Sequence, residues 1–214
     1  MGFYTKYVLP CIIDVAMGNK EMSRLRAAWI PQARGEVLEV GIGSGLNLPF
    51  YSPQVRHIYG LDPSIPLQRM ARTRTEAGPI PVDFLLQSAE EPLPLAQASI
   101  DTVVVTWALC SIADAPKALQ QMKRVLKAGG QLIFIEHGRA PDLGVVGWQD
   151  RLTPAWKRIG GGCHLNRKMD DLIAAAGFHI AELRTGYLPG PRPMTYTYQG
   201  LAHSKETLWV DTKN

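Results

Sequence analysis

Three glycines at alternate positions follow a short apolar segment of the chain. Residues 37–45 read VLEVGIGSG, so Gly41, Gly43 and Gly45 end a predicted strand and precede a predicted helix. Glycine permits a tight turn, a close approach of a ligand to the backbone, and positive φ angles. The loop is therefore typical of a nucleotide-binding turn, although a plain structural turn can have the same composition.

The spacing and charge of this loop narrow the class of nucleotide. The dinucleotide fingerprint G-x-G-x-x-G fails on its third glycine, because position 46 is Leu46. Glu39 precedes the loop, and a carboxylate there repels a pyrophosphate but suits a ligand that carries an ammonium and a sulfonium group. A nicotinamide-dependent Rossmann oxidoreductase therefore stays only as a distant alternative.

A second carboxylate, Asp62, follows the next predicted strand. A carboxylate about 20 residues beyond a glycine loop is placed to accept hydrogen bonds from both ribose hydroxyls. Asp62 can equally cap the helix that follows it, and on its own it does not separate one nucleotide-binding class from another. The order of loop, strand and carboxylate is what favours a nucleotide site.

Side chains with acid–base and aromatic chemistry come after the later predicted strands. Trp107 follows the fourth strand and His137 the fifth, and Trp148 and Trp156 lie further on. A histidine that titrates near neutral pH suits a general base, so His137 is the predicted catalytic residue. A histidine that only hydrogen-bonds a strand end, and tryptophans that only fill the core, are the competing interpretations.

The three cysteines, Cys11, Cys110 and Cys163, are an odd number without CxxC spacing. This pattern indicates neither a disulfide framework nor a structural zinc site. Cys110 and Cys163 can line a pocket, or join His137 or His164 in a metal site that activates sulfur. Buried structural cysteine is favoured over both, so no metal is predicted.

A sheet with helices on both faces is needed to bring these residues together. Short apolar segments alternate with helical patterns, which favours a parallel sheet with crossover helices. The predicted strands cover residues 36–40, 57–61, 82–86, 100–106, 131–136, 179–184 and 196–203. The predicted helices cover residues 67–77, 115–127 and 168–176, the second of them capped by Gly129 and Gly130.

Two regions lie outside this alternation. Residues 1–30 predict one or two helices ahead of the first strand, and residues 137–167 predict a long irregular loop. Ligands bind at the carboxyl ends of strands in such sheets, so the loop is expected to form substrate walls. The N-terminal helices, with Tyr4 and Tyr7, are expected to act as a lid over the acceptor.

Composition sets the broad class of the protein. The 214 residues carry a net charge of +4, with 46% hydrophobic and 20% charged residues, which suits one soluble domain. No apolar segment approaches the roughly 20 residues of a membrane span, and a signal peptide is not recognisable, so a cytoplasmic enzyme is expected. The basic residues are scattered, which argues against nucleic-acid binding. The oligomeric state stays open.

Residues 36–136 resemble class I S-adenosylmethionine-dependent methyltransferases in the order of their motifs. The motif residues are Glu39, Gly41, Gly43, Gly45, Asp62, Pro63, Ser64, Ala89, Glu90, Leu93, Pro94, Asp101 and the segment VLKAGG at 125–130. The resemblance implies a Rossmann-like fold with a seven-stranded, mostly parallel sheet, and S-adenosylmethionine as cofactor. It implies that Asp62 holds the ribose, that Ser88, Ala89 and Glu90 line the adenine, and that Pro63 and Thr106 complete the site. Many family members carry an aspartate at the position of Ser88.

Over roughly residues 36–180 the chain resembles the microsomal thiol S-methyltransferases, which methylate alkyl thiols and hydrogen sulfide. The shared residues are Trp107, Cys110, Glu136, His137, Trp148, Gln149, Pro154, Trp156, Gly162 and Cys163. The resemblance implies a small-molecule thiol acceptor. By their chemistry and position, the residues predicted to form its pocket are Tyr4, Tyr7, Trp107, Cys110, Trp148 and Trp156. Those animal enzymes have an apolar N-terminal membrane anchor, whereas this sequence begins with a predicted helix that contains Tyr4 and Tyr7. N-, O- or C-methylation of a phospholipid, phenol or quinone therefore stays as an alternative.

These interpretations divide one predicted methyltransferase domain, 1–214, into three parts. Residues 1–30 form the helical lid, residues 36–136 the cofactor-binding half, and residues 137–214 the substrate-side half.

Overall fold

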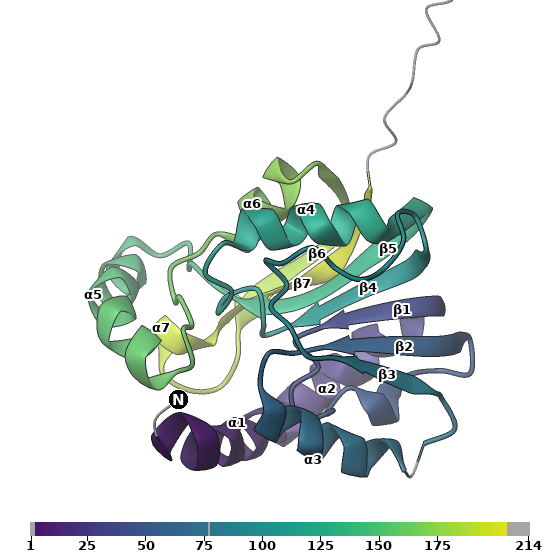
Figure 1. Cartoon of the computed structure of the whole chain (residues 1–214). Coiled ribbons are helices and arrows are strands. Elements are labelled where there is room, and N and C mark those ends of the chain that lie inside the picture. Colours follow the sequence, from purple (N-terminus) through teal and green to yellow (C-terminus); the bar gives the residue numbers. More distant parts are fainter. Residues whose placement is uncertain (1–2, 77, 205–214) are drawn as a thin grey trace, which may run out of the picture.

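A seven-stranded sheet forms the centre of the protein (Figure 1). The computed structural model describes residues 3–76 and 78–204. The strands lie in the order β3-β2-β1-β4-β5-β7-β6, and β7 pairs antiparallel with both of its neighbours. Their bounds are β1 (Gly35–Val40), β2 (Val55–Leu61), β3 (Val82–Leu85), β4 (Ile100–Thr106), β5 (Leu126–His137), β6 (Phe178–Tyr187) and β7 (Tyr196–Ser204). The predicted seven-stranded, mostly parallel Rossmann-like sheet is confirmed.

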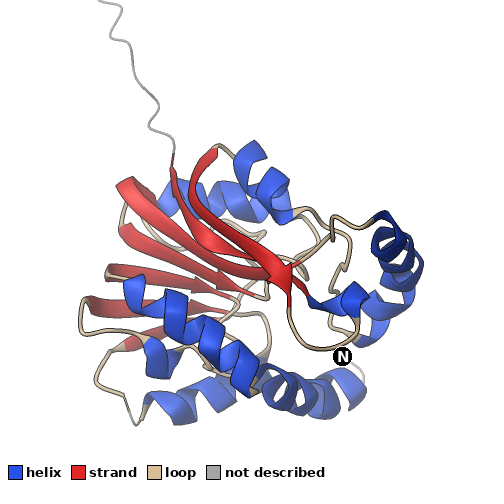
Figure 2. Cartoon of the chain, turned by 180° about the vertical axis from the view of Figure 1, so that it is seen from behind, coloured by secondary structure: helices blue, strands red, loops and turns tan. Residues whose placement is uncertain are grey.

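Successive residues of the central strands feed two apolar clusters on opposite faces of the sheet, because side chains alternate along a strand. Val37 of β1 packs in one cluster with Trp29, whereas its neighbour Leu38 packs in the other with Met122. Helices cover both faces, as parallel sheets require (Figures 1 and 2). These helices are α2 (Lys20–Trp29) and α3 (Ile65–Thr75) on one side, and α4 (Ala115–Val125) and α6 (Met169–Ala175) on the other.

The N-terminal segment is helical, as predicted for residues 1–30, of which residues 1–2 lie outside the described part. A π-helical turn (Tyr4–Val8) leads into α1 (Leu9–Met17), and a 3-10 turn (Ile30–Gln32) follows α2. The Asn19 side chain caps α2 by accepting a hydrogen bond from the Met22 N–H at 3.0 Å. The Asp14 carboxylate lies 3.0 Å from the Arg74 guanidinium of α3, which holds α1 against that helix.

The prediction of a loop over residues 137–167 is wrong for the central part of that segment. This part forms the 17-residue helix α5 (Leu143–Ile159). Two glycines and Pro154 lower the helix propensity of this segment, so the sequence pattern did not indicate a helix. Val146, Gln149 and Thr153 recur at helical spacing and are buried, so packing overrides propensity here. In the described part of the chain, neither α5 nor any other helix has the length and apolar character that a membrane crossing requires.

Two helix boundaries also differ from the predictions. The helix α4 ends at Val125, because β5 begins at Leu126 and runs through the two glycines predicted as a cap. Leu126 pairs with Ile100 and Gln131 with Thr102, so the glycines lie in a bulge of the strand. The helix predicted over residues 67–77 begins two residues earlier, and residue 77 lies outside the described residues. A last short helix, α7 (Arg192–Thr195), precedes β7.

Candidate active site

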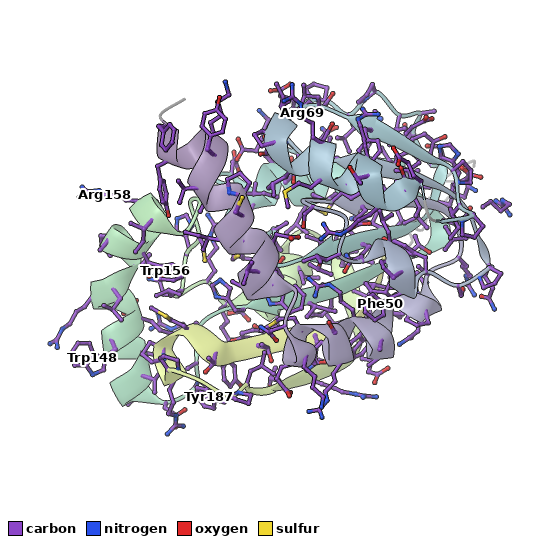
Figure 3. The ribbon with its side chains drawn as sticks, turned by 90° about the horizontal axis from the view of Figure 1, so that it is seen from below. Phe50, Arg69, Trp148, Trp156, Arg158 and Tyr187 are labelled. Atoms are coloured by element: carbon purple, nitrogen blue, oxygen red, sulfur yellow. The ribbon has the colours of Figure 1, made fainter. Side chains whose placement is uncertain are left out.

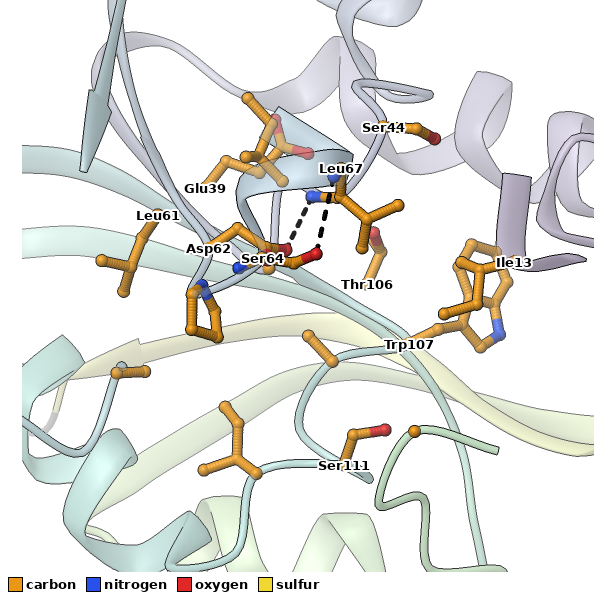
Figure 4. A pocket seen from close by; sticks show the side chains of 18 of the residues that line it. Ile13, Glu39, Ser44, Leu61, Asp62, Ser64, Leu67, Thr106, Trp107 and Ser111 are labelled. Carbon is orange, nitrogen blue, oxygen red and sulfur yellow. Dashed lines mark hydrogen bonds between the residues drawn. The ribbon is translucent and has the colours of Figure 1, made fainter. Parts of the chain in front are cut away.

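A cavity of about 440 Å³ opens at the carboxyl ends of β1, β2 and β4 (Figure 4). Its wall includes Gly41 after β1, Asp62 after β2 and Trp107 after β4. The helix α1 contributes apolar side chains to the same wall, among them Leu9 and Ile13. Open parallel sheets bind ligands at this edge, and the volume lies within the roughly 300–1,000 Å³ of small-molecule sites.

The glycine loop shapes the cavity through its backbone, since φ is +74° at Gly41, +55° at Gly43 and +82° at Gly45. A Cβ atom at Gly41 would collide with the Ala108 side chain. One at Gly43 would meet no atom closer than 3.9 Å and would enter the cavity that this residue lines. Gly45 is not among the lining residues. A Cβ there would come within 3.1 Å of Ala71, so Gly45 lets α3 pack against the loop.

Both carboxylate oxygens of Asp62 accept hydrogen bonds from the backbone. Oδ2 accepts from the Gly43 N–H at 3.0 Å and Oδ1 from the Ser64 N–H at 2.8 Å, and Figure 4 shows Asp62 and Ser64 in the cavity wall. Burial raises the pKa of Asp62, and the two N–H donors oppose that rise. A carboxylate oxygen can accept more than one hydrogen bond, so Asp62 can also bind the hydroxyls of a ribose.

Glu39 is buried near the end of β1 and hydrogen-bonded at both oxygens. Asn47 Nδ2 donates to Oε1 at 2.9 Å, and the Tyr51 hydroxyl donates to Oε2 at 2.8 Å. Asn47 Oδ1 in turn accepts from Arg26 Nε at 2.9 Å. Burial raises the pKa of Glu39 to about 7, although Tyr51, Asn47 and the charge of Arg26 lower it. Glu39 therefore ties the glycine loop to the segment that follows it and to α2.

The turn after β3 forms another part of the wall, with Ser88, Ala89 and Glu90. Ser88 Oγ accepts from the Glu90 N–H at 3.2 Å, and Glu90 Oε1 accepts from the Asp114 N–H at 2.7 Å. The turn is thus fixed to the start of α4. The predicted cofactor residues found in the cavity wall are Glu39, Gly41, Gly43, Asp62, Pro63, Ser88, Ala89, Glu90 and Thr106.

Among the residues predicted for the acceptor, Trp107 lines the cavity. Its φ of +49° is in the left-handed region, which is energetically costly for a bulky residue. Residues with such strained backbone angles are concentrated at functional sites. The guanidinium of Arg26 lies 4.8 Å from the centre of the Trp107 ring. Arg26 itself is buried in the cavity wall, and burial lowers its pKa to about 10 against the opposing charge of Glu39.

The other aromatic residues predicted for the acceptor are not among the residues that line this cavity. The Tyr4 hydroxyl donates to the Ile159 carbonyl at 2.9 Å and so joins the N-terminal turn to the end of α5. Tyr7 and Trp148 are 55% and 56% exposed, and Figure 3 shows Trp148 at the outer side of α5. Trp156 packs against the core. A pocket formed by all three tryptophans is therefore ruled out, because the buried face of α5 does not contain Trp148.

The loop after β4 is held by a buried carboxylate. Glu136 Oε1 accepts from the N–H groups of Ala108 at 2.8 Å and Leu109 at 2.7 Å, and Oε2 accepts from the Cys110 N–H at 3.3 Å. Burial raises the pKa of Glu136, while these donors and neighbouring His137 lower it. The carboxylate thus fixes the turn that carries Trp107 into the cavity.

His137 and two cysteines form a cluster behind this loop. His137 Nε2 lies 2.7 Å from Cys163 Sγ, and together with Cys110 Sγ these atoms lie within 4.8 Å of one another. Burial lowers the pKa of His137, but Cys110 and Glu136 outweigh it and bring the pKa above its ordinary value. The hydrogen bond with Cys163 and burial raise the pKa of Cys110 well above its usual range. His137 is not among the residues that line the cavity.

Sequence reasoning missed Arg26 and Asn47 in the cavity wall and the role of Arg167. Arg167 Nη1 donates to the carbonyls of Leu109 at 2.7 Å and Ile112 at 2.6 Å, so it clamps the loop after β4. A charged residue in phase with the apolar positions of a helix is the signal that could have found Arg26. Nothing local in the sequence indicates the partners of Arg167.

Comparisons with known proteins agree with this geometry. Residues 38–134 match the family model described as a methyltransferase domain. The chain is 30% identical to thiol S-methyltransferase TMT1A of Homo sapiens over 195 residues, which cover 86% of this chain and 79% of that protein. It is 36% identical to thiol S-methyltransferase TMT1B of Rattus norvegicus over 158 residues, which cover 72% of this chain and 64% of that protein. The chain thus spans just under two thirds of the length of the rat protein.

A solved S-adenosylmethionine-dependent methyltransferase from Methanosarcina mazei shares the fold, with a TM-score of 0.64 at 21% identity over 81% of this chain and 93% of that one. The described cavity fits S-adenosylmethionine on three observations. Gly43 leaves open space where a side chain would intrude, Asp62 has accepting capacity left for hydroxyls, and the volume of about 440 Å³ suits a small molecule.

Proposed function

The chain belongs to the class I S-adenosylmethionine-dependent methyltransferases, and from this premise we propose that its methyl acceptor is a small-molecule thiol. Methyl transfer from S-adenosylmethionine is the shared activity of the family. The identity to thiol S-methyltransferases over most of the chain supports the choice of a thiol. The single observation that carries the proposal is the lack of a base on the acceptor side of the described cavity wall.

The residues of the chain bind and orient the donor. Gly41 and Gly43 let it approach the backbone, Asp62 holds its ribose, and the turn at Ala89 faces its adenine. Once bound, S-adenosylmethionine supplies a methyl group on a positively charged sulfur, which needs alignment and desolvation more than acid–base help. The helix α1 contributes Ile13 to the same wall and excludes water as a lid.

Within the described cavity wall, the titratable side chains are Arg26, Glu39, Asp62 and Glu90. Each already has a hydrogen-bond partner in the protein: Asn47 for both Arg26 and Glu39, the Gly43 N–H for Asp62 and the Asp114 N–H for Glu90. The wall segments from α1, from 107–113 and from 160–161 add no titratable side chain. No side chain of these segments can take a proton from an acceptor, which favours a thiol of pKa about 8.5 over a phenol of about 10 or an amine of about 10.4.

The hypothesis that His137 takes the proton of the acceptor stays a prediction. Its Nε2 contacts Cys163 Sγ at 2.7 Å, so this contact has to open before Nε2 can accept a proton from a substrate. The thiol proposal does not depend on that step.

The deciding experiment is an acceptor panel with the purified chain and S-adenosylmethionine. The panel holds an alkyl thiol, the phenol and amine of similar size, a quinol, and vesicles that contain phosphatidylethanolamine. S-adenosylhomocysteine and the methylated product are both measured, with Asp62→Ala as the control that removes donor binding. We expect the thiol to react fastest, with a rate that rises as its thiolate accumulates. A phenol, quinol or lipid amine that outpaces every thiol refutes the proposal and leaves only donor binding.

A further inference from the structure

We propose that Cys110, His137 and Cys163 bind one zinc ion, and that this ion receives the acceptor thiol. The inference rests on the proposed thiol specificity. The two sulfur atoms and the imidazole nitrogen lie within 4.8 Å of one another, on residues from three separate segments. Two thiolates and one imidazole are a ligand set of catalytic zinc sites, in which a fourth position stays open for water or substrate. A reaction without electron transfer also favours zinc over a redox-active metal.

Some distances between the three ligand atoms are shorter, and others can be longer, than the ligand–ligand distance of a tetrahedral zinc site. Bonds of about 2.0 Å to nitrogen and 2.3 Å to sulfur place tetrahedral ligand atoms roughly 3.5–3.8 Å apart. His137 Nε2 and Cys163 Sγ are closer than this at 2.7 Å, and no pair in the cluster exceeds 4.8 Å. Shifts of less than about 1 Å therefore convert the cluster into a tetrahedral site. Two thiolates and a divalent ion sum to zero charge, which a buried site tolerates.

The backbone around the cluster is fixed by bonds that leave the ligand atoms free. Glu136 holds the N–H of Cys110 at 3.3 Å, and the His164 N–H donates to the Cys110 carbonyl at 2.9 Å. Arg167 clamps the same loop through the Leu109 carbonyl at 2.7 Å. A ligand set held by outer hydrogen bonds in this way is typical of metal sites, where the outer partners orient the ligands.

The cluster adjoins the acceptor side of the cavity. Cys110 Sγ lies 3.6 Å from Ser111 Oγ, and Ser111 lines the cavity. The Cys163 N–H donates to the Gly160 carbonyl at 3.3 Å, and Gly160 also lines the cavity. The cluster is therefore next to the part of the cavity wall that Ser111 and Gly160 form, where an acceptor would lie.

The chemistry balances without a further reagent. The acceptor thiol binds as a thiolate and releases its proton to solvent, because a metal-bound thiol is deprotonated. Its sulfur forms a bond to the methyl carbon while the bond from that carbon to the donor sulfur breaks. The electron pair of the broken bond stays on the donor sulfur, which leaves as a neutral thioether. The products are a methyl thioether, S-adenosylhomocysteine and one proton, and the ion is unchanged.

The test measures metal binding without donor or acceptor. The full chain is prepared under reducing conditions in the presence of zinc, its metal content is measured by mass spectrometry, and cobalt(II) then replaces zinc for absorption spectroscopy. We expect about one zinc per chain and a thiolate-to-cobalt charge-transfer band. Cys110→Ser and Cys163→Ser should lower metal occupancy roughly tenfold or more. Cys11→Ser, which removes the exposed cysteine of α1, should retain it.

Several results would overturn the site. The first is a wild-type chain that binds no zinc or shows no thiolate–cobalt band. The second is equal metal content in the wild type and in both serine variants. The third is a Cys110–Cys163 disulfide in place of metal. If the serine variants do not fold, Cys163→His keeps a ligand and should bind cobalt with a weaker thiolate band. The wild-type spectrum decides the question even without variants.

Failure of this inference differs from failure of the proposed function. A metal-free chain that methylates thiols at the full rate refutes the zinc site and keeps the thiol specificity. A chain that binds zinc through these residues but methylates a phenol or an amine keeps the site and refutes the thiol specificity.

Discussion

The donor side and the acceptor side of the cavity differ in how far apart in the sequence their hydrogen-bonded residues lie. The hydrogen bonds of Asp62 reach 19 residues back to Gly43 and 2 residues forward to Ser64. On the acceptor side, Arg167 bonds to Leu109 across 58 residues, and the Tyr4 hydroxyl bonds to the end of α5 across 155. The donor site is therefore set by local strand–loop units, whereas the acceptor site exists only once distant segments have docked.

The largest effect we expect is on donor binding, and it separates the two sides. Asp62→Ala removes a carboxylate that can bond two ribose hydroxyls, at about 1.5–3 kcal/mol for each charged hydrogen bond. Affinity for S-adenosylmethionine should fall by roughly two to four orders of magnitude in calorimetric titration. Asp83→Ala is the matched control, because Asp83 lies on the neighbouring strand β3 with an exposed carboxylate. Unchanged affinity in Asp62→Ala would remove this residue from the site.

A second prediction concerns the pH dependence of stability on the donor side. Glu39 keeps its proton up to about pH 7 in the folded protein but loses it near 4.5 when unfolded. Between these values the folded state binds more protons, so stability falls as pH rises, by at most about 3 kcal/mol. Above the folded pKa the effect is constant. Glu39→Gln has no proton to lose and should lack this decline.

Urea unfolding of the wild type and Glu39→Gln between pH 4.5 and 8 measures this pH-dependent loss of stability. The difference between the two curves of unfolding free energy against pH isolates the contribution of one carboxyl group. Parallel curves would show that the folded protein ionises Glu39 at its ordinary pKa. Above about pH 7 we also expect a modest loss of donor affinity in Glu39→Gln, since Asn47 and Tyr51 lose a charged acceptor there.

The contrast between the two sides also explains what the sequence could predict. The strand, the glycine loop and Asp62 are consecutive parts of one motif, so their spacing along the chain implies their proximity in space. The adenine turn at Ser88 to Glu90 follows the next strand in the same way. Nine of the ten residues predicted for the cofactor accordingly line the cavity, and Gly45 differs because it packs against α3.

The acceptor side could not be predicted by the same reasoning. The helix α5 has poor propensity and forms because its buried face packs, and only that packing decides that Trp148 points outward. The contact between His137 and Cys163 depends on where the segment after α5 returns to the sheet. The sequence indicates which residue types have the chemistry, but their assembly comes from contacts between distant segments.

A third prediction distinguishes backbone strain from occupation of the cavity. Gly43 and Gly129 have φ angles of +55° and +71°, and a Cβ atom finds open space at both. Alanine should therefore cost about 1–2 kcal/mol of stability at either position. Only a methyl group at position 43 would enter the cavity. Gly43→Ala alone should therefore lower the affinity for S-adenosylmethionine roughly tenfold. Equal affinities in the two variants would show that the loop does not approach the donor.

The smallest effect we expect is at the tie between the lid and α3, where the two sides of the cavity meet. The Asp14–Arg74 pair is 3.0 Å apart with side chains 21% and 32% exposed, so it contributes only about 0.2–1 kcal/mol. Because α1 adds Ile13 to the wall, Asp14→Asn should raise the KM for the acceptor up to about fivefold and change donor affinity less. High salt should bring the wild type towards the variant, since salt screens exposed pairs. Glu21→Gln breaks a more exposed pair within α2, with side chains 38% and 62% exposed, and should change neither constant. If Asp14→Asn matched Glu21→Gln at low salt, α1 would be a packing helix and not a lid.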